Sequence, residues 1–255
     1  SNRPSSSINS QEASKTVFKN EKPYPAPELK GIQDWINSDP LTLASLKGRV
    51  VLIAFWTYSC INCQRTQPYL NMWYDKYKDD GFVIIGAHAP EFAFEKVPSN
   101  VRQAVKEAKL KYPVALDNDF ATWQAYKNQY WPAKYLIDKD GQVRYTHFGE
   151  GNYDETEGAI QTLLKESGHK ITNNIDKNNG AVPVQNGQTP ETYLSYERGE
   201  RFANVDQFKQ DQTNNYKLVD KLQEHGWSLG GDWSIGAKES VACSAASVVS
   251  VKFIA

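Results

Sequence analysis

The stretch FWTYSCINCQRTQPYL, residues 55–70, contains two of the three cysteines of the chain, Cys60 and Cys63, separated by two residues. It follows RVVLIAF, residues 49–55, a continuous apolar run typical of a strand buried on both faces of a sheet. Beyond Cys60 the apolar residues recur at helical spacing instead. The cysteine pair therefore lies where a buried strand passes into a helix.

The expected helix brings one set of side chains onto a single face, namely Cys63, Leu70, Trp73, Tyr74 and Tyr77. Pro68 lies within it, where the missing backbone N–H predicts a kink. Cys60 then stands at the N-terminus of the helix and Cys63 one turn inward.

Strands and helices alternate through the next hundred residues. We expect a strand at 81–90, a helix at 99–112 capped by Ser99 or Asn100, a strand at 112–117, a helix at 119–129, strands at 133–138 and 142–148 joined by a turn at 138–141, and a helix at 154–167 with Ile160, Leu163 and Leu164 inward. This order predicts an α/β fold with helices on both faces of a mostly parallel sheet, made mixed by an antiparallel hairpin at its end.

The ends of the chain differ from this pattern. Residues 1–22 are polar and are interpreted as a flexible N-terminal tail, without the apolar segment of a signal peptide. Residues 23–168 form the α/β domain, and 169–188, rich in Asn and Gly, are interpreted as a linker. Residues 189–255 predict a smaller, mainly β unit that is incomplete, with a weakly helical segment at 206–224, a hairpin at 226–236 turning at Gly230–Gly231, and a last strand at 247–255.

Composition limits the function. The 255 residues carry a net charge of −1 with mixed signs, which gives no indication of a nucleic-acid partner. No apolar run reaches the roughly 20 residues of a membrane-spanning helix.

The cysteine pair has three competing interpretations. Zinc would need four ligands, but the four histidines are scattered and Cys243 is far along the chain. A structural disulfide across two residues would constrain the unfolded chain little, and an inert buried pair is the third possibility. A cysteine at a helix N-terminus, however, is stabilised as a thiolate by unpaired N–H groups and the helix dipole. We therefore predict thiol–disulfide exchange, with Cys60 as the nucleophile and Cys63 as the resolving thiol.

The segment VVLIAFWTYSCINC resembles the active-site segment of thioredoxin-like proteins, and Pro68 matches the proline of that family's active-site helix. YWPAKYLIDKDGQV, residues 130–143, resembles the family's cis-proline loop and following hairpin. The resemblance implies a thioredoxin fold, a cis peptide before Pro132, and a substrate contact through the backbone of Trp131. It implies chemistry by the cysteines alone, with no metal and no bound organic cofactor.

Residues 25–63, together with GAHAPEFAFEK, are most similar to the TlpA-like domain of DipZ-type proteins, and residues 189–255 resemble part of the jelly roll that follows it, which is like a carbohydrate-binding module. This resemblance implies an extracytoplasmic, membrane-tethered or periplasmic domain cut from a longer chain. It would reduce protein disulfides with electrons from a membrane partner of the CcdA type. Two alternatives stay open: an oxidase or isomerase on the same fold, and an envelope- or carbohydrate-binding protein that carries an inactive thioredoxin domain.

The sequence departs from the family in proton transfer. Many thioredoxins bury an aspartate six residues before the first cysteine, where this chain has Ala54. Related reductive proteins carry a glutamate after the second strand, so the resemblance implies Glu91 as the base for Cys63, with Glu95 as the less favoured substitute.

Several aromatic and polar residues near the pair have two interpretations each. Ser59 replaces the usual tryptophan, and Trp56 and Tyr58 either supply aromatic surface for substrate docking or belong to the core. His88 is expected to be a hydrogen-bonded histidine at a strand end. The tryptophans of residues 189–255 either pack in a core or form a sugar platform, and core packing is favoured.

Overall fold

The computed structural model describes residues 18, 22–175 and 191–253. The chain divides into two compact units, residues 1–182 and 183–255, which are described separately below. Most of the expected N-terminal tail, and residues 176–188 of the expected linker, lie outside the described residues.

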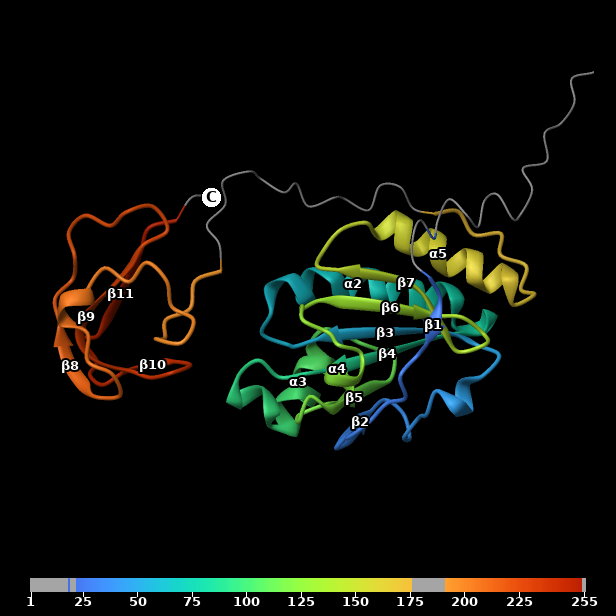
Figure 1. The fold of residues 1–255 in the computed structure, drawn as a ribbon, viewed down its shortest axis with the longest axis horizontal. Helices are drawn as coiled ribbons and strands as arrows, with labels where there is room; N and C mark the ends of the chain where they lie inside the picture. The colour runs from blue at the N-terminus through green and yellow to red at the C-terminus, as the bar shows by residue number, and fades with distance from the viewer. Residues whose placement is uncertain (1–17, 19–21, 176–190, 254–255) are drawn as a thin grey trace, which may run out of the picture. The chain divides into compact units, whose positions relative to one another are not determined.

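A seven-stranded sheet forms the centre of the first unit, in the order β1-β7-β6-β3-β4-β5-β2. Figure 1 shows its inner strands lying one beneath another. Its strands are β1 (Tyr24–Pro25), β2 (Asp34–Ile36), β3 (Val50–Trp56), β4 (Phe82–His88), β5 (Val114–Leu116), β6 (Ala133–Ile137) and β7 (Gln142–Phe148).

The central position of β3 follows from its composition. All seven of its residues are buried, as the apolar run predicts, and the same holds for β4. Strand β3 is parallel to β4 and antiparallel to β6, while β6 and β7 form the expected antiparallel hairpin. The expectation of a mostly parallel sheet is wrong, because β6 returns antiparallel beside β3 and the outer strands are antiparallel as well. The mixed sheet is confirmed.

Helices cover both faces of the sheet. They are α2 (Ile61–Tyr77), α3 (Pro98–Glu107), α4 (Ala121–Ala125) and α5 (Tyr153–Glu166). Buried side chains of α2, α3 and α5 join one core cluster, and α4 contributes to the cluster on the other face. The expected cap of α3 is wrong: Val97 is the N-cap residue and Pro98 takes the first helical position, where its missing N–H has no cost.

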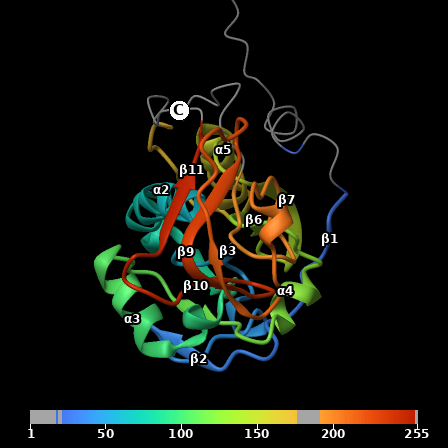
Figure 2. The ribbon, with the colours of Figure 1, turned by 90° about the vertical axis from the view of Figure 1, so that its left-hand side faces the viewer.

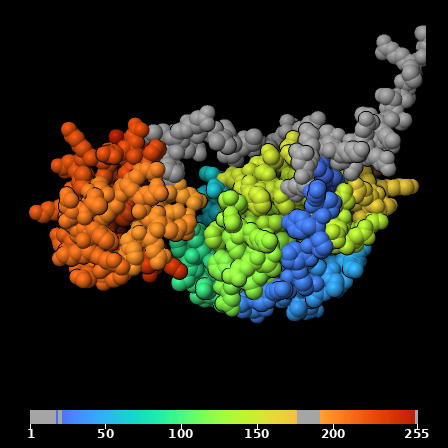
Figure 3. Space-filling view, viewed as in Figure 1, coloured from blue at the N-terminus to red at the C-terminus, as the bar shows by residue number. Residues whose placement is uncertain are grey.

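The segment before β3 contains structure that we did not expect. Strands β1 and β2 pair with β7 and β5, and a short 3-10 helix, η1 (Ala44–Leu46), lies between β2 and β3. In the space-filling view this blue segment lies against the green part of the same unit (Figure 3). Two- and three-residue strands are too short to give a hydrophobic period, so only the completed sheet defines them.

The second unit contains four antiparallel strands, in which β9 pairs with the other three. They are β8 (Thr213–Tyr216), β9 (Trp227–Ile235), β10 (Ser240–Ala242) and β11 (Val248–Val251). The weakly helical interpretation of 206–224 is wrong, because this segment contains β8 and, of helical structure, only part of the 3-10 turn η4 (Val205–Gln207). The last strand is confirmed in β11.

The expected hairpin at Gly230–Gly231 is also wrong. Strand β9 runs through both glycines, beside β11 (Figure 2). A Cβ at Gly230 would lie 2.6 Å from the Leu218 side chain, and Gly231 has φ +84°. The glycines therefore permit close packing and a change of pairing partner instead of a chain reversal.

Candidate active site

Cys60 and Cys63 occupy the two positions expected of an exchange pair. Cys60 is the N-cap residue of α2, with extended backbone angles, and its side chain is partly exposed. Cys63 is buried, at 1% exposure. The Cys63 N–H donates to Cys60 Sγ over 3.4 Å, so a free helix-terminal donor points at the outer sulfur. Both residues are thiols in this structure.

The surroundings of the inner sulfur favour its protonated form. Burial raises the pKa of the Cys63 thiol well above its usual range, and the hydrogen bond and charge of Cys60 raise it further. The negative charge of Glu95 acts in the same direction. Cys63 must therefore lose a firmly held proton before it can attack a disulfide.

The loop before β6 also reaches this edge of the sheet. The Trp131–Pro132 peptide is cis, as expected. Because Ala133 pairs with Phe55 at the end of β3, the loop lies next to the turn that carries Cys60. Pro132 is buried and Trp131 is half-buried, with its indole N–H donating to the Ala89 carbonyl over 3.0 Å. Trp131 and Cys60 pack against the same core cluster.

Glu95, the less favoured of the two glutamates, has the more enclosed carboxylate. It is fully buried and lies in the 3-10 turn η3 (Ala93–Lys96). Its Oε1 accepts from the Ser59 N–H (3.1 Å) and Ser59 hydroxyl (2.7 Å), and its Oε2 accepts from the N–H groups of Glu91 (2.7 Å) and Phe92 (2.9 Å). Burial alone would raise the pKa of the Glu95 carboxyl, but hydrogen bonds from Thr57, Ser59 and Phe92 outweigh it and lower the pKa. Glu95 thus ties the η3 turn to the residue before Cys60.

Glu91 is half-buried and meets Glu95 through its own backbone N–H. The structure therefore brings both glutamates to the active-site edge, and the role of Glu91 as a base stays a prediction.

The aromatic residues around the turn differ in accessibility. Trp56 is 3% exposed and packs edge-on against His88, which places it in the core. Tyr58 is half-buried, stacks on His88 and donates its hydroxyl to the Phe94 carbonyl over 3.3 Å. Both line a hollow of about 360 Å³ together with Gln64, Gln67, Ala104, Glu107 and Ala108. Docking through Tyr58 and Trp56 remains a prediction, and only Tyr58 has appreciable surface.

His88 is fully buried, and its hydrogen bonding is incomplete. Its Nε2 lies 3.5 Å from the Thr57 hydroxyl, and Nδ1 has no partner in the described part of the chain. His88 thus lies at a strand end and is hydrogen-bonded at Nε2, as expected, while Nδ1 departs from that expectation. Burial lowers the pKa of His88 to about 4, although the Glu95 charge opposes the shift, so the ring is neutral at neutral pH.

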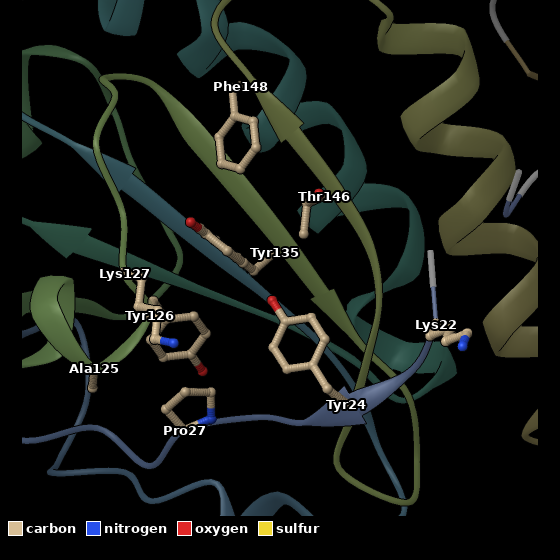
Figure 4. A pocket seen from close by; sticks show the side chains of 9 residues that line it. All are labelled: Lys22, Tyr24, Pro27, Ala125, Tyr126, Lys127, Tyr135, Thr146 and Phe148. Atoms are coloured by element: carbon tan, nitrogen blue, oxygen red, sulfur yellow. The ribbon is translucent and has the colours of Figure 1, made fainter. Parts of the chain in front are cut away.

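A second hollow, of about 520 Å³, is lined by residues of β1, β6, β7 and the end of α4 (Figure 4). Four aromatic residues, Tyr24, Tyr126, Tyr135 and Phe148, line it. Tyr135 belongs to the core cluster that does not contain Cys63, so this hollow is separate from the exchange site.

In the second unit, Trp227 and Trp233 are buried in a core cluster, as favoured from the sequence, and neither offers a ring face to a sugar. Cys243 is exposed. Among residues 18, 22–175 and 191–253, no group of three or more His, Cys, Asp or Glu side chains is placed to hold a metal ion. No helix in the described part of the chain is long and apolar enough to cross a membrane.

Sequence reasoning missed one charged residue of this region, Lys134. It is fully buried on β6, two residues after Pro132. The available signal was a lysine within the otherwise apolar strand AKYLI, all of whose residues are buried.

Two family models match the chain. Residues 25–164 match Redoxin, and residues 189–255 match a thioredoxin-like C-terminal domain. Protein DipZ of Mycobacterium bovis is 41% identical over 215 residues, which are 82% of this chain and 31% of the relative. The chain thus spans about a third of the length of the DipZ proteins that it matches.

Two smaller proteins are matched over nearly their whole length. The thiol-disulfide oxidoreductase YkuV of Bacillus subtilis is 30% identical over 143 residues, which are 56% of this chain and 96% of that protein. The solution structure of a thioredoxin-like protein in its oxidised form superposes with a TM-score of 0.52 and 32% identity, covering 56% of this chain and 95% of that one. The chain belongs to the redoxin family, and its first unit has a thioredoxin-like fold.

Proposed function

We propose that this chain reduces disulfides of other proteins outside the cytoplasm and receives its electrons from a membrane thiol donor of the CcdA type. The observation that carries the exchange chemistry is the asymmetry of the pair: Cys60 is partly exposed at a helix N-terminus, and Cys63 is buried one turn below it. The 41% identity to DipZ supports the resemblance from which we infer the reductive direction and the location.

The reaction has two steps. Cys60 thiolate attacks one sulfur of a substrate disulfide, so that a Cys60–substrate bond forms and the substrate's S–S bond breaks. Cys63 then loses its proton and attacks Cys60 Sγ. The Cys60–Cys63 disulfide forms, and the substrate sulfur leaves and takes up a proton. Two electrons pass from the cysteine pair to the substrate, and the membrane donor restores the dithiol.

The loop of Trp131 and Pro132 is the proposed docking edge for substrate backbone, because it meets the turn of Cys60 at the same end of the sheet. Tyr58 contributes aromatic surface beside it. Glu91 is proposed as the base for Cys63, and its half-buried position next to Glu95 is compatible with that role.

Equilibration of the chain with glutathione and dithiothreitol buffers tests the reductive direction. We expect a reduction potential near that of reducing thioredoxins, about −270 mV, because a reductant must hold its disulfide more firmly than its substrates do. A value near −120 mV, typical of a strong oxidant, would instead favour an oxidase.

Insulin reduction with dithiothreitol as electron source tests the exchange chemistry itself. Cys60→Ser should lose the catalysed rate, and Cys243→Ser is the matched control because Cys243 is exposed in the other unit. Full activity of the Cys60→Ser variant would contradict the role of Cys60 as the nucleophile. A parent chain that gives no rate above that of dithiothreitol alone would favour a binding protein with an inactive thioredoxin domain.

A further inference from the structure

Lys134 is a buried cation next to the exchange site. Side chains alternate along β6, so Lys134 and Leu136 face the core that contains Cys63, whereas Ala133 and Tyr135 face the opposite core. Lys134 is 0% exposed. Removing an ammonium group from water is costly unless other groups compensate its charge.

The contacts of this ammonium group compensate it weakly. Among the described residues, its Nζ donates to the Gly149 carbonyl over 3.3 Å and lies 5.6 Å from the centre of the Tyr153 ring. Its cross-strand neighbours are Ala54 on β3 and His147 on β7. Ala54 is small, so β3 offers the ammonium group no polar partner.

Charged and titratable groups face Lys134 from the other elements around it. Cys63 on α2 and Glu150 in the loop before α5 both favour its charged form. Glu150 Oε1 lies 3.4 Å from Arg65, and its Oε2 is buried without a partner in the described part of the chain. His147 Nε2 donates to the Glu150 carbonyl over 3.0 Å, and burial, with the Lys134 charge, lowers the pKa of His147.

Burial lowers the pKa of Lys134 to about 8, against the pull of Cys63 and Glu150. This is the range in which a small change in a neighbouring charge moves its proton occupancy. Cys63 is such a neighbouring group, because its thiol is buried in the core that Lys134 faces.

We propose that Lys134 is a positioning residue for the resolving step, whose buried ammonium group stabilises the Cys63 thiolate as it attacks the mixed disulfide. The inference rests on the proposed exchange between Cys60 and Cys63. The bond changes are those of the resolving step: the Cys63–Cys60 bond forms, the Cys60–substrate bond breaks, and the proton released by Cys63 balances the one gained by the departing sulfur. Lys134 keeps its covalent bonds and supplies the compensating charge.

The direct test is the acidity of Cys63. In a Cys60→Ser, Cys243→Ser background Cys63 is the one cysteine left in the sequence, so the pH dependence of its alkylation by iodoacetamide, followed by mass spectrometry, reports the Cys63 thiolate. The Lys134→Met variant replaces the ammonium group by an uncharged side chain of similar length. It should raise the titration midpoint of the Cys63 thiol by about one pH unit, so that about tenfold less thiolate is present at a given pH. Lys134→Arg should keep the original midpoint, and Lys139→Met, an exposed lysine in the following turn, is the matched control. A Lys134→Met midpoint equal to that of the parent would overturn the proposal.

A kinetic measurement relates this acidity to turnover. The dithiol protein reacts with an aromatic disulfide in two phases, first at Cys60 and then by resolution through Cys63. At pH 7 Lys134→Met should slow the second phase about tenfold and the first phase less than threefold. Equal second phases would contradict the inference, whereas loss of the first phase in the parent would contradict the proposed function.

If the Lys134→Met variant does not fold, the interaction between Lys134 and Cys63 can be tested by changing Cys63 and titrating Lys134. Lysine 13Cε resonances follow Lys134 in the parent and in Cys63→Asp. A carboxylate in place of the neutral thiol should raise the Lys134 midpoint, because a negative charge at this position favours the ammonium form. An unchanged midpoint would show that the two groups are not coupled.

Discussion

Cys63 interacts with two buried charges of opposite sign, and the regions that hold them are built differently. The Glu95 carboxylate accepts four hydrogen bonds from Ser59, Glu91 and Phe92. Among the described residues, the Lys134 ammonium group donates to one carbonyl, that of Gly149. The Glu95 charge is thus compensated by hydrogen-bond donors around it, whereas the protonation of Lys134 depends more on the charges of nearby side chains.

This difference has a chemical meaning. A carboxylate saturated by N–H and O–H donors keeps its charge over a wide pH range and acts as a fixed anchor for the turn before Cys60. A weakly compensated ammonium group can gain from a new negative charge nearby. We therefore expect Glu95 to matter mainly for the stability of the fold, and Lys134 mainly for the resolving step of the reaction.

The largest effect should come from removing the anchor. Glu95→Ala leaves buried backbone donors without a partner, so we expect a loss of about 4 kcal/mol in the free energy of unfolding. Urea unfolding measures it. Glu91→Ala, at the half-buried neighbour, should cost less than about 1 kcal/mol. Equal losses in the two variants would show that Glu95 is no more structural than Glu91.

His88, which lies beside the anchor, should make stability depend on pH. Its folded pKa is about 4, below the unfolded value of about 6.5, so the unfolded chain binds the extra proton first. Stability is therefore complete above about pH 6.5 and falls as the pH drops toward 4, by about 3 kcal/mol. Unfolding curves at pH 7 and pH 4.5 measure this. The His88→Gln variant should lose most of the difference, and an unchanged pH dependence in that variant would assign it to other groups.

A smaller effect of opposite sign is expected on the lysine side. The folded pKa of Lys134, about 8, is below the unfolded value near 10.4, so at pH 7 the fold carries a charge that it disfavours. Lys134→Met should stabilise the protein by about 2 kcal/mol at pH 7, and the gain should shrink as the pH rises from 8 to 10.4. Thermal and urea unfolding measure it. A destabilised variant would mean that the ammonium group is better compensated than its contacts indicate.

The secondary-structure elements that carry the site could be predicted from the sequence, because each is encoded by residues close together along the chain. A buried strand, a helix starting at a cysteine and a cis-proline loop each leave a pattern within ten or fifteen residues, and the structure has all three. The hairpin of β6 and β7 was found for the same reason.

What the sequence did not predict depends on contacts distant along the chain. The burial of Glu95 needs the η3 turn to fold against Ser59, 36 residues away. The burial of Lys134 depends on strands β3 and β7 on either side. Gly230 and Gly231 suggest a turn locally, yet β9 continues through both, with Leu218 packed close to Gly230. In each case tertiary packing overrides the local pattern.

The division of labour between the cysteines is tested most directly by trapping. In a Cys63→Ser, Cys243→Ser variant, Cys60 should form a stable mixed disulfide with a disulfide-containing protein, and peptide mapping by mass spectrometry should find the partner on Cys60. The matched Cys60→Ser, Cys243→Ser variant, which keeps only the buried Cys63, should form at least tenfold less adduct. An adduct of equal yield on Cys63, or none on Cys60 while the parent chain reduces the same protein, would contradict the assignment of Cys60 as the attacking thiol.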